Sequence, residues 1–142
     1  MFGSIRKGAI AGVAGGVVFG MSMAMMGMLP VIAGMVGSSS PVVGFFIHLM
    51  MSAMIGAGFG VVFGSLATST GRALAAGAGY GIFWWVLGPL TVMPLMMGMG
   101  FGSQWNGASI QHAMPSLMGH LIYGLITGFV FLRLSRVRAG DA

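Results

Sequence analysis

Histidine and methionine are the residue types through which this 142-residue chain could do chemistry. It carries three histidines and 16 methionines, but it has no cysteine and only one acidic residue, Asp141. Thiolate nucleophiles and thiolate metal sites are therefore excluded, and so are paired carboxylates and Ser/His/Asp arrangements. Imidazole and thioether groups remain, and together they favour a soft ion such as Cu(I). Without an acid–base or nucleophilic constellation, we do not expect an enzyme.

The elements that must position these side chains are transmembrane helices. Hydrophobic residues make up 57% of the chain and charged residues 5%, with a mean hydropathy of +1.00, whereas soluble domains carry about 25% charged residues. Backbone amides in lipid need partners within their own segment, which favours helices of about 20 residues. We therefore predict an all-α integral membrane protein with a four-transmembrane-helix bundle, as a single transmembrane domain over residues 1–142. The predicted spans are 8–36, 41–66, 73–99 and 115–132.

Prolines suggest where these spans begin, bend or end. Pro41 and Pro115 are expected at helix starts, because a backbone N–H in the first turn has no hydrogen-bond partner within the helix and proline lacks this N–H. Pro30, Pro89 and Pro94 lie inside or near the ends of the first and third spans. We expect kinks or early helix ends at these three positions.

All six lysine and arginine residues fall on one side of this four-span arrangement. They precede the first span, separate the second from the third and follow the fourth: Arg6, Lys7, Arg72, Arg133, Arg136 and Arg138. The loops on the opposite side, 37–40 and 100–113, have none. The positive-inside rule therefore predicts cytoplasmic N and C termini, with residues 133–142 as a basic cytoplasmic tail. The apolar run after Lys7 is longer than a signal peptide needs, so we expect the first span to be retained.

The location of these charges also indicates which partners the chain favours. A sequence pI near 11.5 could suggest nucleic acid, but charges at the ends of apolar spans orient a membrane protein and contact anionic lipid. We therefore expect a lipid bilayer as partner, no nucleic acid, and an integral location in a prokaryotic plasma membrane. A homo-oligomer or a larger membrane complex is compatible with this composition.

The two halves of the sequence resemble each other. Segment 7–16 matches segment 72–81 in its basic first residue and its small residues, and His48 matches His120. Two tandem two-helix repeats would be related by a pseudo-twofold axis along the membrane normal. Within the spans, glycine and alanine recur at steps of four, mainly in the cytoplasmic half. This spacing predicts close helix packing there, since small residues let helix backbones approach in lipid.

The outer half has a different composition, because it holds every methionine except Met1. Long, flexible thioether side chains replace glycine, so we expect the helices to stand further apart toward the outside. This segregation suggests a bundle that is narrow at the cytoplasm and lined by thioethers at its outer mouth.

We predict a Cu(I) site in this outer half, used to bind or transport a soft metal ion. His48 and His120 lie at equal depth below the outer boundary, and Met51 lies one helical turn from His48. Met97 and Met118 are the expected contributors from the other spans. A shared site requires inward-pointing imidazoles with ring nitrogens within roughly 8 Å of each other.

Two other interpretations stay open. His48 and His120, on different helices at matching depth, are also the pair that a bis-histidine haem b would need. Alternatively, methionine is adaptable core filler, and the chain is a structural or accessory subunit of a larger membrane complex. A Soret band from the purified protein would indicate haem, and stoichiometric copper would indicate the metal site.

Overall fold

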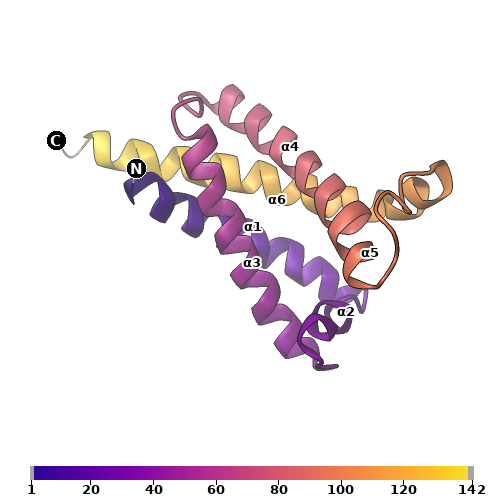
Figure 1. Cartoon of the computed structure of the whole chain (residues 1–142). Helices are drawn as coiled ribbons and strands as arrows, with labels where there is room; N and C mark the ends of the chain where they lie inside the picture. Colours follow the sequence, from indigo (N-terminus) through magenta and orange to yellow (C-terminus); the bar gives the residue numbers. More distant parts are fainter. Residues whose placement is uncertain (1, 141–142) are drawn as a thin grey trace.

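Helices make up nearly all of the computed structural model, which describes residues 2–140 and their side chains through Arg136. Met1, Asp141, Ala142 and the Arg138 side chain lie outside the described residues. Within the described part, four helical segments are long and apolar enough to cross a membrane (Figure 1). They are α1 (Phe2–Met25), α3 (Pro41–Phe63), α4 (Thr70–Leu87) with its continuation to Met96, and α6 (Gly107–Gly140).

The first apolar stretch is not one helix to residue 36. Helix α1 ends at Met25, and Gly27 adopts the left-handed conformation with φ of 67°. The N–H of Met28 donates to the Met23 carbonyl and that of Gly27 to the Ala24 carbonyl, which is the Schellman arrangement that closes a helix. The chain then turns back through α2 (Leu29–Ala33), which packs beside the start of α3, and continues into the 3₁₀ turn η1 (Gly34–Val36).

The third span contains a wide turn. Helix α4 continues into a π-helical turn, η2 (Gly88–Val92), and then into the short α5 (Met93–Met96). Pro89 and Pro94 both lie in this region, where we expected a distortion. A proline donates no N–H, so a switch from i−4 to i−5 hydrogen bonding is one way to continue the helix past it.

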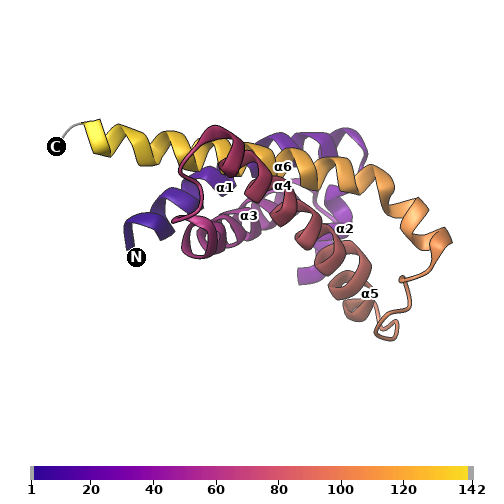
Figure 2. The ribbon, with the colours of Figure 1, turned by 90° about the horizontal axis from the view of Figure 1, so that it is seen from above.

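The fourth helix begins earlier than predicted. Helix α6 starts at Gly107, and Pro115 lies inside it rather than at its start. The side-chain oxygen of Asn106 accepts a hydrogen bond of 3.0 Å from the Ser109 N–H, which caps the new first turn. Pro115 cannot donate to the carbonyl one turn earlier, and Figure 2 shows α6 bent near its first turns. By contrast, Pro41 does occupy the first turn of α3, as predicted.

The helices are arranged as two hairpins that meet along α1 and α6. Helix α1 packs on α3, α4 packs on α6, and α1 packs on α6 between the hairpins. Helices α3 and α4 diverge from the loop that joins them (Figure 1). The Tyr80 hydroxyl donates to the Ile55 carbonyl and the Tyr123 hydroxyl to the Ser52 carbonyl, both at 2.8 Å. These bonds attach the second hairpin to α3.

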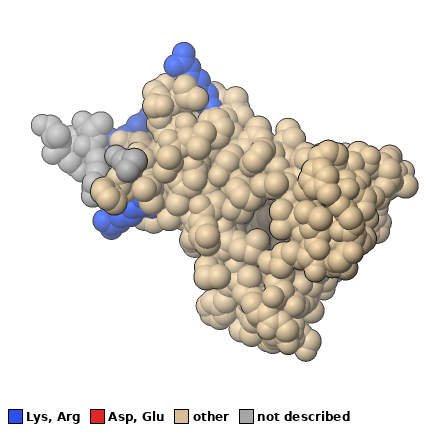
Figure 3. All heavy atoms as spheres, viewed as in Figure 1, with Lys and Arg blue, Asp and Glu red and all other residues tan. Residues whose placement is uncertain are grey.

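The two ends of the bundle differ in charge and in packing. The described lysine and arginine side chains gather at one end, which we call the basic end (Figure 3). The opposite end, called the methionine-rich half, comprises the end of α1, α2, the start of α3, η2, α5 and the start of α6. Here the two hairpins stand apart, and the space-filling surface is hollowed between them (Figure 3). The two hairpins are therefore further apart where methionine replaces glycine.

Candidate functional site

Glycine contacts fix the helix pairs that carry the histidines. A Cβ added to Gly12 of α1 would strike the Ser52 carbonyl of α3, and one added to Gly77 of α4 would strike the Gly124 carbonyl of α6. Both clashes are with backbone, which cannot move aside as a flexible side chain can. The close packing predicted from the small-residue spacing is therefore present in both hairpins.

His48 is a buried cross-link between α1 and α3. Its side chain is 9% exposed, and its Nε2 lies 3.0 Å from the Gly16 carbonyl oxygen. A carbonyl can only accept, so Nε2 carries the hydrogen and donates it, and the lone pair of the neutral ring is on Nδ1. His48 therefore lies at a helix–helix interface, as predicted, but its Nε2 is occupied by this bond.

His120 makes its hydrogen bond within its own helix. Its Nδ1 lies 2.8 Å from the Ser116 carbonyl oxygen one turn earlier, so Nδ1 is the donor and Nε2 keeps the lone pair. Within the described residues Nε2 has no hydrogen-bond partner. It faces the start of η2, because a Cβ added to Gly88 would lie 3.9 Å from this nitrogen.

The two imidazoles meet the same aromatic ring. The Phe19 ring centroid lies 5.4 Å from that of His48 and 4.8 Å from that of His120, with edge-on geometry in both cases. Phe19 comes from α1, between the helices that carry the histidines. The structure therefore brings both histidines into one neighbourhood, but through Phe19 rather than through facing ring nitrogens.

Two of the three methionines chosen from the sequence have exposed side chains. Met97 is 68% exposed and Met118 is 62% exposed, while Met51 is partly exposed. Twelve of the 15 methionines after Met1 have exposed side chains. Only Met23, Met51 and Met93 are not exposed. We expected thioethers to line the outer mouth of the bundle, but most of these methionine side chains lie on its exterior surface.

Two inward-facing methionines were not chosen from the sequence. Met23 is buried in a cluster with Phe19 and Tyr123, and Met93 packs against the same cluster. Met23 follows Phe19 by one helical turn, a spacing that the sequence does show. Met93 gives no such signal, because its direction depends on the extra residue in the π-helical turn η2.

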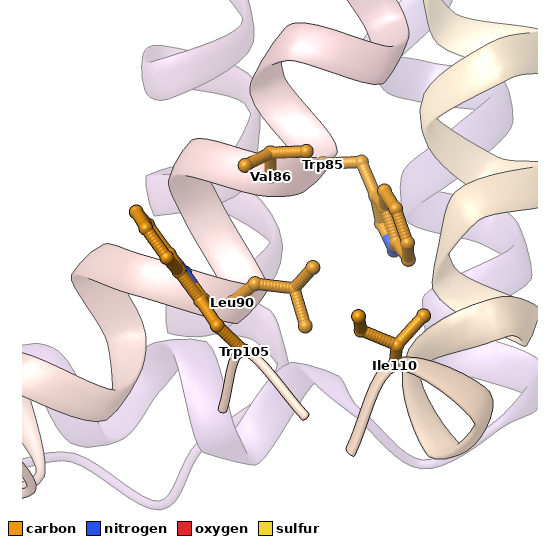
Figure 4. Close-up of a pocket in the computed structure, with 5 residues that line it drawn as sticks. All are labelled: Trp85, Val86, Leu90, Trp105 and Ile110. Atoms are coloured by element: carbon orange, nitrogen blue, oxygen red, sulfur yellow. The ribbon is translucent and has the colours of Figure 1, made fainter. Parts of the chain in front are cut away.

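A hollow of about 310 Å³ lies where the end of α4, η2, the loop before α6 and the first turn of α6 meet (Figure 4). Trp85, Val86, Leu90, Trp105 and Ile110 line it. The Trp85 Nε1–H donates to the Ala113 carbonyl at 3.0 Å, and the Trp105 Nε1–H donates to the Thr91 hydroxyl at 3.3 Å. Both indole donors are therefore occupied, and the hollow presents apolar surface. It is suited to hydrocarbon contact rather than to chemistry.

The chemistry open to this half of the molecule is limited to imidazole and thioether groups. In the part of the chain that the structure describes, no three histidine or carboxylate side chains could together hold a metal ion. Comparison with protein-family models, curated proteins and solved structures finds no match to this chain. The function must therefore be inferred from the contacts of its own residues.

Proposed function

We propose that this protein is a structural membrane subunit that associates with other transmembrane helices through its methionine-rich half. The observation that supports this function is the exposure of 12 of its 15 methionines there. Met25 and Met54 are among the most exposed. In a monomer these thioethers would contact only lipid, whereas in an assembly they would form the interface.

Lipid alone does not account for this surface. The half of the bundle next to the basic end would contact the same lipid hydrocarbon. Its exposed apolar side chains, however, are aliphatic or aromatic, as at Val61, Val62 and Phe83. Helices in lipid associate by van der Waals packing, because no hydrophobic force drives them together. Methionine is flexible and polarizable, and it is used where a surface must adapt to a partner. We propose that the partner is a second copy of this chain. Cross-linking to another membrane protein would be the alternative result.

Cysteine cross-linking in the native membrane tests this association, since the chain has no cysteine of its own. Met50→Cys and Met54→Cys place a thiol on the exposed methionine face of α3. Val61→Cys lies two turns further along the same helix, also exposed, and is the matched control. We expect cross-linked dimers from the first two variants and few from the third. A monomeric protein that yields no cross-link from either methionine position would overturn the proposal.

The orientation in the membrane is a further part of the proposal. We infer that the basic end is cytoplasmic, in a prokaryotic plasma membrane, with its basic residues against anionic lipid headgroups. The clustering of the described lysines and arginines at one end supports this orientation (Figure 3). Labelling of Ser39→Cys and Asn106→Cys from outside, with Thr70→Cys protected, is the expected result. Labelling of Thr70→Cys from outside would reverse the orientation.

We also infer that the two hairpins are copies related by a pseudo-twofold axis along the membrane normal. Matching positions make matching contacts. Gly12 lies against Ser52 and Gly56 in the first hairpin, just as Gly77 lies against Gly124 and Gly128 in the second. An experimental structure in which α1 and α3 superpose on α4 and α6 in this register would support the duplication, and a different register would refute it.

Soft-metal binding and haem b binding, the two cofactor functions predicted from the sequence, are not equally supported by the contacts of the histidines. Soft-metal binding is favoured by one observation, the free Nε2 of His120. A bis-histidine haem b is not favoured, because His48 uses its Nε2 for the bond to Gly16 and the Phe19 ring contacts both imidazoles. Haem insertion would have to break that bond and displace that ring. Cu(I) needs only two to four soft donors, so its binding requires neither the loss of that bond nor the displacement of that ring.

A further inference from the structure

His120 has the orientation of a metal-ligating histidine. Such a histidine typically donates one ring N–H to a backbone carbonyl or a carboxylate, which fixes the tautomer and presents the other nitrogen to the metal. The 2.8 Å bond from Nδ1 to the Ser116 carbonyl does this, and Nε2 is left to face Gly88. Because Gly88 has no side chain, the space in front of Nε2 is not filled from that position.

The π-helical turn η2 places a thioether on the same face. The N–H of Met93 donates to the Gly88 carbonyl, so one wide turn separates the two residues. Five residues in that turn, instead of four, bring Met93 above Gly88, where an α-helix would bring Val92. Met93 accordingly packs against the cluster that contains Phe19, whereas Val92 is exposed.

A third soft donor comes from α1. Met23 lies one turn beyond Phe19, is 9% exposed, and belongs to the same buried cluster as Phe19 and Tyr123. Leu29 and Ile32 of α2 complete this cluster and keep it apolar. No charged side chain belongs to it. Neutral thioether and imidazole donors in apolar surroundings favour a soft monovalent ion over a hard divalent one.

We propose that His120, Met93 and Met23 form a Cu(I) site beside Phe19, with one imidazole nitrogen and two thioether sulfurs as ligands. The site lies within one chain, so it does not depend on the association proposed above. It replaces the predicted set of His48, Met51, Met97 and Met118 around His120. The π-helical turn is the device that creates the site, because it turns Met93 inward.

Competition against a chromophoric Cu(I) chelator, under anaerobic reducing conditions, tests the proposal on the purified full chain. We expect one Cu(I) per chain. Met23→Leu and Met93→Leu preserve size and apolar packing, and each should weaken binding by at least about tenfold, as loss of even an outer-shell partner does. His120→Ala should abolish binding. X-ray absorption should show one nitrogen and two sulfur ligands.

Two matched controls separate this site from general methionine affinity. Met97→Leu with Met118→Leu removes two exposed thioethers and should leave the affinity unchanged. Val92→Met with Met93→Val keeps the composition but moves the thioether by one residue onto the exposed face, and it should weaken binding as much as Met93→Leu does. The proposal is wrong if the chain binds no stoichiometric Cu(I), if Met23→Leu and Met93→Leu bind normally, or if the exposed pair carries the affinity. Cross-linking at Met54 is independent of all three outcomes.

Discussion

The first hairpin, α1 with α3, and the second, α4 with α6, each contain one histidine beside Phe19, and they use it in different ways. His48 donates across the helix interface to Gly16, whereas His120 donates to Ser116 within its own helix. The first imidazole ties two helices together, and the second keeps its Nε2 free. The carbonyl that its N–H reaches therefore decides whether such a histidine ties two helices together or keeps one ring nitrogen free.

The partner helix accounts for this difference. Helix α1 is regular past Gly16 and continues to Met25, so α3 remains tightly packed along it, and a Cβ on Gly20 would come within 3.0 Å of the His48 ring. Helix α4 packs just as closely on α6 at Gly81, where an added Cβ would strike the His120 carbonyl, but it ends at Leu87 and continues into η2, where an added Cβ on Gly88 would lie 3.9 Å from His120 Nε2. An irregular backbone, rather than a different residue type, makes the second hairpin the better candidate for chemistry.

The largest loss of stability is expected when a bulky residue replaces a glycine at a helix–helix contact. Gly56→Leu in the first hairpin and Gly124→Leu in the second would drive a side chain into the facing backbone of Gly12 and Gly77. We expect each to cost about 3 kcal/mol or more, as overpacking does at its upper range. Thermal unfolding in detergent, or loss of expression, measures this effect.

Gly79→Leu is the control for these two variants. Gly79 lies on α4, but nothing is within 4 Å of a Cβ added there. Gly102 would be a poor control, although it lies in a loop, because its φ of 73° strains any other residue. If Gly56→Leu is tolerated as well as Gly79→Leu, the hairpins are not packed backbone to backbone.

A smaller loss of stability is expected when either histidine is replaced by alanine, and the size of the loss should differ between the two. His48→Ala removes a bond between helices, worth about 0.6 kcal/mol on average, together with the packing of a buried ring, and we expect it to lower the free energy of unfolding by about 1 kcal/mol or more. His120→Ala removes a bond within one helix and should cost less. Unfolding of both variants in a denaturing detergent series makes the comparison. Equal losses would show that the two histidines have the same structural role.

Local patterns were sufficient to predict much of this fold from the sequence. Hydropathy predicted the four apolar spans, and steps of four between small residues predicted the contacts at Gly12 and Gly77. The proline of α3 was also placed correctly. The early start of α6 had a readable signal in Asn106, a capping residue three positions before Ser109, but the polar composition of that segment obscured it.

The proposed ligand set of His120, Met93 and Met23 could not be predicted in the same way. Which methionines face inward depends on how far apart the hairpins stand and on the extra residue that η2 inserts before Met93. Neither quantity is a local property of the sequence. Helical spacing alone favoured Met51, Met97 and Met118, and it gave no indication that the latter two would be exposed. The left-handed Gly27 was likewise hidden within a continuous apolar stretch.

The smallest expected effect concerns the contact between the hairpins. Tyr80→Phe and Tyr123→Phe each remove one hydroxyl that donates to a carbonyl of α3, at Ile55 or Ser52, and leave the ring in place. We expect a loss of about 0.6 kcal/mol for each, the average for hydrogen bonds between membrane helices.

The double variant tests whether these two bonds act separately. The hydroxyls come from different helices, α4 and α6, so their losses should add to within a few tenths of a kcal/mol. This double-mutant cycle is measured by unfolding the two single variants and the double variant in the same detergent series. A loss in the double variant much larger than the sum would mean that the hairpins separate when both bonds are gone. The two hairpins would then depend on these tyrosines more than on the packing of α1 against α6, which is the contact that we expect to hold them together.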